Sequence, residues 1–156
     1  MSESTLDNRY MEFLLGDQLF AIPLMSVKEV IQRPEITGVP NMPPHFEGMM
    51  NLRGQILGVF NVRKKLAAKH KEARITTPEV VVVIEHEGLS VGMLVDEVTR
   101  VLHAHGDMLK TAPIRNDDPA ARYIKSVIQC ENEMVLTIDA SELLEIEKYK
   151  NKIVAA

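Results

Sequence analysis

The sequence predicts a mainly β protein, in which two small barrels pack around a shared hydrophobic core and a few short helices are added. Short runs rich in Val, Ile, Leu, Met and Phe alternate with turn residues, as in sandwiches and barrels. A hairpin followed by Val27-Lys-Glu-Val30 recurs 68 residues later as a hairpin followed by Val95-Asp-Glu-Val98, which indicates an internal duplication. Chance similarity between Val-rich strands is the alternative. Because a small lobe buries only a modest core, two such lobes should share an apolar seam.

The chain begins with a predicted hairpin. Arg9–Leu15 alternates apolar and polar side chains, as a half-buried strand does. Gly16-Asp17 is a Gly-first hairpin turn, and the apolar run 19–25 is typical of a buried return strand. Pro23 within that run indicates an edge or a bulge. Val27-Lys-Glu-Val30 is expected to continue in extended form.

The next segment presents a charged residue on a predicted turn. Four prolines between 34 and 44 predict a rigid, irregular connection. Two apolar strands then flank the turn Asn51-Leu-Arg-Gly54, where Gly54 can supply a left-handed backbone angle at little cost. Arg53 is therefore expected on a tight turn between two rigid strands, where binding residues are often found. The alternative is that Arg53 is an ordinary solvated turn residue.

The second half of the chain is predicted to repeat the strand-rich pattern. Its expected strands are 79–87, 89–95, 98–104, 123–130 and 134–138, with turns at Gly88 and Glu131-Asn132. Residues 67–78 and 107–122 are expected to be surface connections. Short helices are expected after Asn61, which can cap a helix, and after Asp139, which opens the capping box Asp139-Ala-Ser-Glu142.

Composition excludes several classes of protein. The 156 residues fit one compact domain or two small lobes, and an apolar content of 46% can supply a core. A net charge of −4 and an aromatic content of 4% argue against a general nucleic-acid binder. The single Cys130 excludes an intrachain disulfide and fits a reducing compartment. No signal peptide or membrane-spanning run is visible, so we expect a cytoplasmic protein that meets membranes only through a partner.

No arrangement of catalytic residues stands out, and we expect no enzymatic activity, no cofactor and no metal. Phosphate-loop, dinucleotide and nucleophile-elbow motifs are absent from the sequence. Cys130 lies in an apolar strand and is expected to be an inert thiol. His103-Ala-His105 could pair on a metal with His86 as a distant third ligand, but no further ligand has suitable spacing. Asp96 and Glu97 would face opposite sides of a strand, so they make a poor acid–base pair.

Two features favour binding over catalysis. The basic segment 63–74 is either a solvated face or a phosphate- or nucleic-acid-binding surface. The nine methionines, which include Met42, Met49, Met50 and Met93, either fill the core or form an adaptable interface. A groove between two lobes could accept the apolar face of a partner helix.

Over residues 9–147 the chain resembles the CheW family, the adaptor proteins of bacterial chemotaxis. The matching features, in order, are the first hairpin, Val27-x-Glu-Val30, the proline-rich link, Phe46-Glu-Gly48, Asn51-Leu-Arg-Gly54, the Val-rich strand, Gly92 to Val98, and the final strand and helix. After the central turn the family usually has Pro-Val-Ile-Asp-Leu-Arg. Here Gly58 replaces the Pro and Asn61 replaces the Asp, while Arg63 is retained.

The resemblance implies two SH3-like five-stranded barrels in one domain at 9–147, with the first strand able to complete the C-terminal barrel. It implies a flexible N-terminus at 1–8 and a tail at 148–156. It also implies a non-enzymatic adaptor that couples methyl-accepting chemoreceptors to the histidine kinase CheA, whose regulatory domain has the same fold. An adaptor of a related surface-motility pathway is the alternative.

Carried over position by position, the resemblance implies a surface that binds the cytoplasmic tips of chemoreceptors. Its side chains are those of Val27, Glu29, Val30 and Arg53, and the residues that shape the backbone beside them are Gly48, Asn51 and Gly54. The kinase-binding surfaces can be placed only loosely, on the barrel ends. An Arg/Glu pair beside apolar walls would set the register of a receptor helix.

Overall fold

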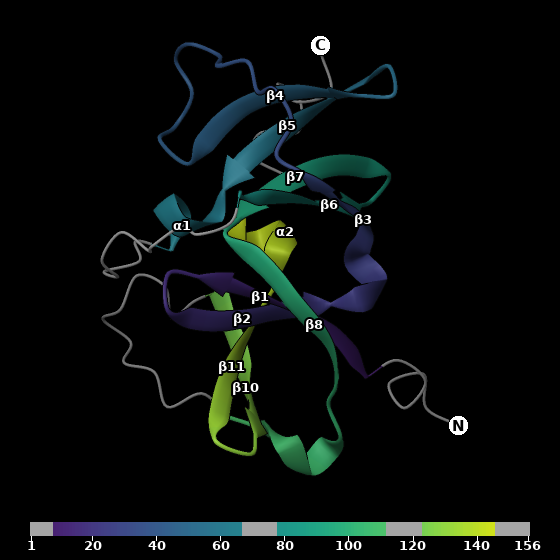
Figure 1. Ribbon diagram of the computed structural model, residues 1–156, viewed down its shortest axis with the longest axis vertical. Coiled ribbons are helices and arrows are strands. Elements are labelled where there is room, and N and C mark those ends of the chain that lie inside the picture. Colours follow the sequence, from purple (N-terminus) through teal and green to yellow (C-terminus); the bar gives the residue numbers. More distant parts are fainter. Residues whose placement is uncertain (1–7, 67–77, 112–122, 146–156) are drawn as a thin grey trace.

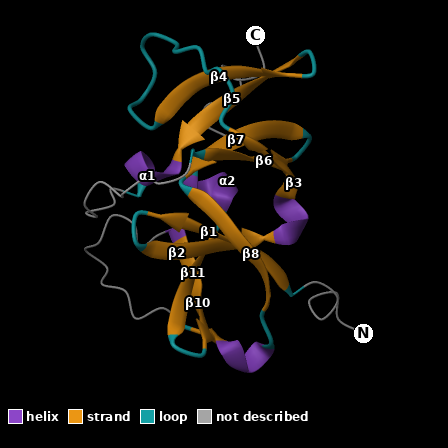
Figure 2. Ribbon diagram, viewed as in Figure 1, coloured by secondary structure: helices purple, strands orange, loops and turns teal. Residues whose placement is uncertain are grey.

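The computed structural model describes residues 8–66, 78–111 and 123–145. Residues 1–7 of the expected flexible N-terminus 1–8, the C-terminal tail at 148–156 and most of the two expected surface connections lie outside these ranges. The described residues form two twisted sheets stacked along the long axis of the molecule, with short helices at their junction (Figure 1). Strands make up most of the described chain (Figure 2), so the mainly β fold predicted from the sequence is confirmed.

Each sheet forms one lobe. The five-stranded lobe has the strand order β3-β6-β7-β5-β4, with bounds Val27–Gln32, Val80–His86, Leu89–Val95, Gln55–Asn61 and Phe46–Leu52. The six-stranded lobe has the order β8-β1-β2-β11-β10-β9, with bounds Glu97–His103, Arg9–Leu15, Gln18–Pro23, Glu133–Ile138, Ile124–Cys130 and Leu109–Lys110. The helices are α1, Val62–Lys65, and α2, Ala140–Leu143, with the 3-10 turns η2, Leu24–Ser26, and η3, Gly106–Met108.

The two sheets repeat one topology. If β1, β2, β3, β4 and β5 are matched with β6, β7, β8, β10 and β11, the order β8-β1-β2-β11-β10 becomes β3-β6-β7-β5-β4. The parallel pair β2–β11 likewise matches the parallel pair β7–β5. The internal duplication read from the sequence is therefore confirmed, and the short β9 is an addition to one copy.

The repeats exchange strands. In each repeat the third strand leaves its own hairpin and pairs with the first strand of the other repeat, so that β3 lies against β6 and β8 lies against β1. The six-stranded lobe consequently takes both strands of the N-terminal hairpin. The resemblance implied that the first strand can complete that barrel; β1 does lie in it, and β2 joins it there.

The core is shared between the lobes, as the sequence predicted. One buried cluster joins Phe13, Phe20 and Ile22 of the six-stranded lobe to Phe60, Val82, Ile84 and Met93 of the five-stranded lobe. Smaller clusters fill the interior of each lobe. Because one continuous apolar layer runs through the junction, burial of apolar surface holds the lobes together.

Two local predictions were wrong in their bounds. The return strand expected over 19–25 ends at Pro23, because proline has no N–H to continue the ladder, and η2 follows it. The expected surface connection at 107–122 contains the short strand β9 in its described part. The helix caps were predicted correctly, since the side chains of Asn61 and Asp139 accept the backbone N–H groups of Lys64 and Glu142.

Gly48 allows the proline-rich connection to lie against β4. It sits at a bulge where β4 shifts its register against β5, with φ of 151°. A Cβ atom built at this position would clash with the carbonyl oxygen of Thr37. Thr37 exchanges two backbone hydrogen bonds of 2.8 Å with Met49, so the backbone oxygen in the way is itself held in place.

We therefore expect Gly48→Ala to lower the free energy of unfolding by about 2 kcal/mol or more, because both the backbone angle and the contact become strained. Gly38→Ala is the matched control, since a Cβ there meets no atom within 4 Å. It should change stability by less than about 0.5 kcal/mol. Urea denaturation of both variants measures the difference, and equal stabilities would contradict this account of Gly48.

Candidate functional site

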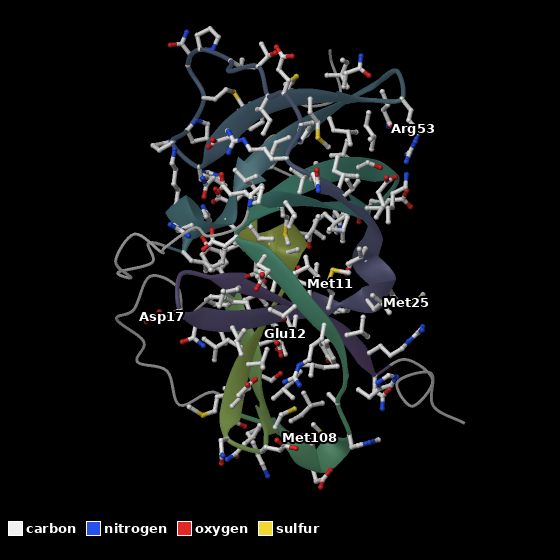
Figure 3. The ribbon with its side chains drawn as sticks, in the orientation of Figure 1. Met11, Glu12, Asp17, Met25, Arg53 and Met108 are labelled. Atoms are coloured by element: carbon white, nitrogen blue, oxygen red, sulfur yellow. The ribbon has the colours of Figure 1, made fainter. Side chains whose placement is uncertain are left out.

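An ion pair between Arg53 and Glu29 lies at the β4–β5 turn of the five-stranded lobe. The two guanidinium nitrogens of Arg53 each donate to one carboxylate oxygen of Glu29, both at 2.8 Å. Glu29 is on β3 and Arg53 is on the β4–β5 turn, and β3 and β4 are the opposite edges of the sheet. The pair therefore joins the two edges where the sheet curls round, and Figure 3 shows Arg53 at the tip of the hairpin.

The β4–β5 turn holds Arg53 in a defined position. Arg53 and Gly54 both have positive φ, 52° and 88°, as a two-residue hairpin turn requires. The side-chain oxygen of Asn51 accepts the backbone N–H of Gly54 at 2.8 Å and closes the turn. The sequence predicted the left-handed angle at Gly54, whereas the left-handed angle at Arg53 was not predicted.

The pair keeps both groups ionised. The hydrogen bonds from Arg53 hold the pKa of the Glu29 carboxyl below its usual range, and Glu29 in turn raises the pKa of the Arg53 guanidinium. The Arg53 side chain is 72% exposed and that of Glu29 is 27% exposed. Water screens such a pair, so its main effect is to orient the guanidinium rather than to stabilise the fold.

A bulge on β3 divides the predicted site residues between two faces. Val27 pairs with Ile84 but Glu29 pairs with Val83, so Lys28 is the extra residue. As a result, Val27 and Val30 share the face of the common core, and Glu29 turns toward the interior of the lobe and Arg53. Val27 is half-buried and Val30 is 38% exposed.

A groove lies beside the ion pair. It has a volume of about 520 Å³ and runs between β4 and the proline-rich connection. Four of its lining residues are apolar and three are polar: Pro34, Met49, Met50 and Ile56, and Glu35, Thr37 and Asn51. Ile56 is 43% exposed, so apolar surface is available next to the exposed charge of Arg53.

The methionines are divided between the core and accessible surface. Met93 is fully buried in the shared core and Met50 is buried in the five-stranded lobe. Met49 lines the groove, and Met42 packs against the core while remaining partly accessible. Met25 on η2 is the most exposed large apolar side chain among the described residues, at 77%.

The basic residues of α1 are occupied by acidic partners. Arg63 pairs with Asp96, Lys64 with Glu47 at 3.6 Å, and Lys65 with Glu145 at 2.9 Å. The remaining cations of the basic segment 63–74 lie outside the described residues. Within α1, therefore, the cations serve internal contacts instead of forming a phosphate-binding surface.

Among the described residues, no cluster of three or more His, Cys, Asp or Glu side chains could hold a metal ion. His103 ends β8 and His105 precedes η3, with both side chains exposed. Cys130 is half-buried at the end of β10, where it packs against the interior of the six-stranded lobe. None of the helices in the described part of the chain is long and apolar enough to span a bilayer.

Sequence reasoning missed the role of Asp96. The sequence offered it only as a poor catalytic carboxylate, but it is a buried acceptor between the lobes that binds the backbone N–H of Gly16 and the guanidinium of Arg63. The available signal was an acidic residue directly after a strand that is apolar except for Ser90. Asn61, which departs from the usual family residue, donates through its amide to Glu47 at 3.4 Å, a contact that a carboxylate could not make.

Comparison with known proteins identifies relatives. A family model described as the CheW-like domain matches residues 9–148. The chemotaxis protein CheW of Bacillus subtilis is 28% identical over 143 residues, which cover 90% of this chain and 89% of that protein. Protein PilI of Pseudomonas aeruginosa is 30% identical over 95 residues, which cover 58% of this chain and 50% of that protein.

The fold also has a close counterpart among solved structures. The crystal structure of the scaffolding protein TtCheW from Thermoanaerobacter tengcongensis matches with a TM-score of 0.76 and 24% sequence identity. The match covers 88% of this chain and 87% of that one, so the likeness of fold extends over both lobes.

If Arg53 is what lowers the pKa of Glu29, Arg53→Gln should raise that pKa toward its usual value. Lys28→Gln should raise it less, because Lys28 contributes only a weaker charge interaction. Carboxyl ¹³C NMR over a pH titration measures both shifts. Any stability that the pair contributes is present above the usual carboxyl range and is lost as the pH falls through the lowered pKa of Glu29. A larger shift in the Lys28 variant would contradict this assignment.

Proposed function

Because the chain belongs to the CheW-like domain family, we propose that it is a non-enzymatic adaptor of bacterial chemotaxis that couples methyl-accepting chemoreceptors to the histidine kinase CheA. The observation that carries this proposal is the Glu29–Arg53 pair, held on a rigid turn beside an apolar groove. Such an arrangement offers shape, apolar surface and a directed charge to another protein. It supplies no paired nucleophile and base.

The receptor-binding surface in this proposal consists of Val27, Glu29, Val30 and Arg53, with Gly48, Asn51 and Gly54 as its backbone supports. A chemoreceptor tip is a helical bundle, and a helix binds by laying apolar side chains against apolar surface. Val27 and Val30 on one face of β3 would meet those side chains. The guanidinium of Arg53, oriented by Glu29, would pair with a receptor carboxylate and set the register of the helix.

Family membership also supports the kinase as the second proposed partner. The regulatory domain of CheA is expected to have this fold and to bind at the ends of the barrels. The protein would act in the cytoplasm as the single domain 9–147 and would meet membranes only through receptors. No nucleic acid is expected as a partner, which agrees with the ion-paired cations of α1.

A second candidate is an adaptor in a related surface-motility pathway. The observation that supports it is the similarity to a relative named PilI instead of CheW. The two candidates share the binding surface and differ in the receptor and kinase served. Pull-down of native partners from the source cells, followed by mass spectrometry, separates them.

The proposed receptor surface predicts that Arg53→Glu weakens binding to a receptor cytoplasmic fragment by about tenfold or more, because the variant repels the receptor carboxylate. The melting temperature should change little, since Arg53 is largely exposed. Isothermal titration calorimetry and thermal denaturation measure the two effects.

Lys110→Glu is the control, because it makes the same change of charge at an exposed position in the other lobe. It should leave receptor binding unaltered. Equal receptor affinities for wild type and Arg53→Glu would remove Arg53 from the site, and equal losses in both variants would point to net charge alone.

A further inference from the structure

The two edges of the junction between the lobes differ. At the α1 edge, Asp96 lies on the crossover from β7 to β8 and accepts the backbone N–H of Gly16 at 2.7 Å. The same carboxylate oxygen pairs with the guanidinium of Arg63 from α1, and the backbone N–H of Asp96 donates to Leu14 at 3.1 Å. The Asp96 side chain is only 9% exposed. Arg63 therefore fills this edge and links α1 to the β7–β8 crossover.

The internal duplication places an equivalent helix at the opposite edge. Two segments of the chain have the same structure: each has a capping side chain, one helical turn and a leucine at its end. They are Asn61–Leu66 and Asp139–Leu144. The backbone angles of the caps agree, with φ and ψ of −89° and 104° at Asn61 and of −95° and 107° at Asp139. Counting from the caps, Ser141 occupies the position of Arg63. Figure 1 shows α2 between the lobes.

A pocket of about 310 Å³ is lined by Ser141, the position equivalent to Arg63. The rest of its lining comes from both lobes: Tyr10 of β1, Pro23, Ser26, the end of β6, β10, β11 and the start of α2. The short Ser141 side chain hydrogen-bonds to the capping Asp139 at 2.7 Å and does not bridge the lobes. The arginine that closes the α1 edge is thus absent from the α2 edge.

Two acidic and two basic side chains line this pocket. Glu85 and Asp139 supply the carboxylates, while His86 and Lys125 are the basic members. One carboxylate oxygen of Glu85 pairs with Lys28 at 3.4 Å. Lys125 lies 3.1 Å from Glu142, which offsets its charge. Burial alone would raise the pKa of Asp139, but hydrogen bonds from Ser141 and from the Glu142 amide hold it below its usual range. Apolar walls are formed by Pro23, Ile84 and Ile138.

We propose that this pocket binds an arginine side chain of a partner protein, which takes the place that Arg63 fills at the other edge. The apolar walls suit the methylene stem of arginine, and the carboxylates suit its guanidinium. Met25, 77% exposed between the lining residues Pro23 and Ser26, gives the partner an adaptable apolar contact at the rim. Neither the pocket nor Met25 is part of the proposed receptor surface.

The test uses the full chain labelled with ¹⁵N and titrated with N-acetyl-arginine amide, which mimics an arginine within a polypeptide. Saturable shifts are expected at Ser26, Glu85 and Ser141, with a dissociation constant on the order of millimolar. Glu85→Gln and Asp139→Asn should each weaken binding about fivefold, since each removes one carboxylate and Asn still caps a helix. Glu131→Gln, which removes a carboxylate outside the pocket, should have no effect.

A second variant tests the equivalence of the two edges. Ser141→Arg should fill the pocket from within and abolish the shifts, whereas Ser141→Ala should retain them. A far-UV spectrum and a melting curve establish that each variant is folded. If Ser141→Arg does not fold, the two carboxylate variants still decide the question.

Three results would overturn the proposal. The first is no shift at the pocket, or shifts that the carboxylate variants leave unchanged. The second is equal binding of N-acetyl-lysine amide, which would make the site a general cation site. The third is binding of free arginine more than about tenfold tighter than that of the blocked form, which would indicate a small-molecule ligand. No receptor or kinase is present in these titrations, so their failure would leave the proposed adaptor function standing.

Discussion

The pairing of each repeat's third strand with the other repeat is the constraint on which the structure depends. It places β3 against β6 and β8 against β1, so the chain crosses between lobes at η2 and at Asp96. One apolar core must then pass through the junction, and both junction edges must be made by short helices that follow equivalent hairpins. This exchange also sets the position of the proposed receptor surface, because β3 starts directly after η2, where the chain passes from one lobe to the other.

Local irregularities then give the site its geometry. The bulge at Lys28 turns Glu29 away from the face that carries Val27 and Val30, and the positive φ of Arg53 aims its side chain back across the mouth of the lobe. Without the bulge, Glu29 would lie on the same face of β3 as Val27 and would not face Arg53. A charge held in this way is presented to a binding partner at a low entropic cost, since its side chain is already ordered.

The sequence predicted well whatever depends on short-range pattern. Alternation, turn residues and caps located β1, the Asn51–Gly54 turn and both helix starts, and the repeated Val-x-Glu-Val segment revealed the duplication. It could not predict features that depend on which strands meet. The transfer of both N-terminal strands to the other lobe, the edge-to-edge reach of Arg53 and the burial of Asp96 follow from long-range pairing, about which local propensity carries little information. For the same reason the pairing of Arg63 with Asp96 was not predicted, although Arg63 was noted in the basic segment and as a retained family position.

The exchange of strands also bears on how such a fold can arise. A polypeptide with only one repeat would hold a hairpin, a departing strand and a second hairpin, and its sheet would lack a strand. Two identical copies could complete each other by trading those strands, in the manner of an intertwined homodimer. Joining the copies end to end removes the dependence on concentration and frees each half to diverge, so that one edge of the junction can carry an arginine while its counterpart carries a serine.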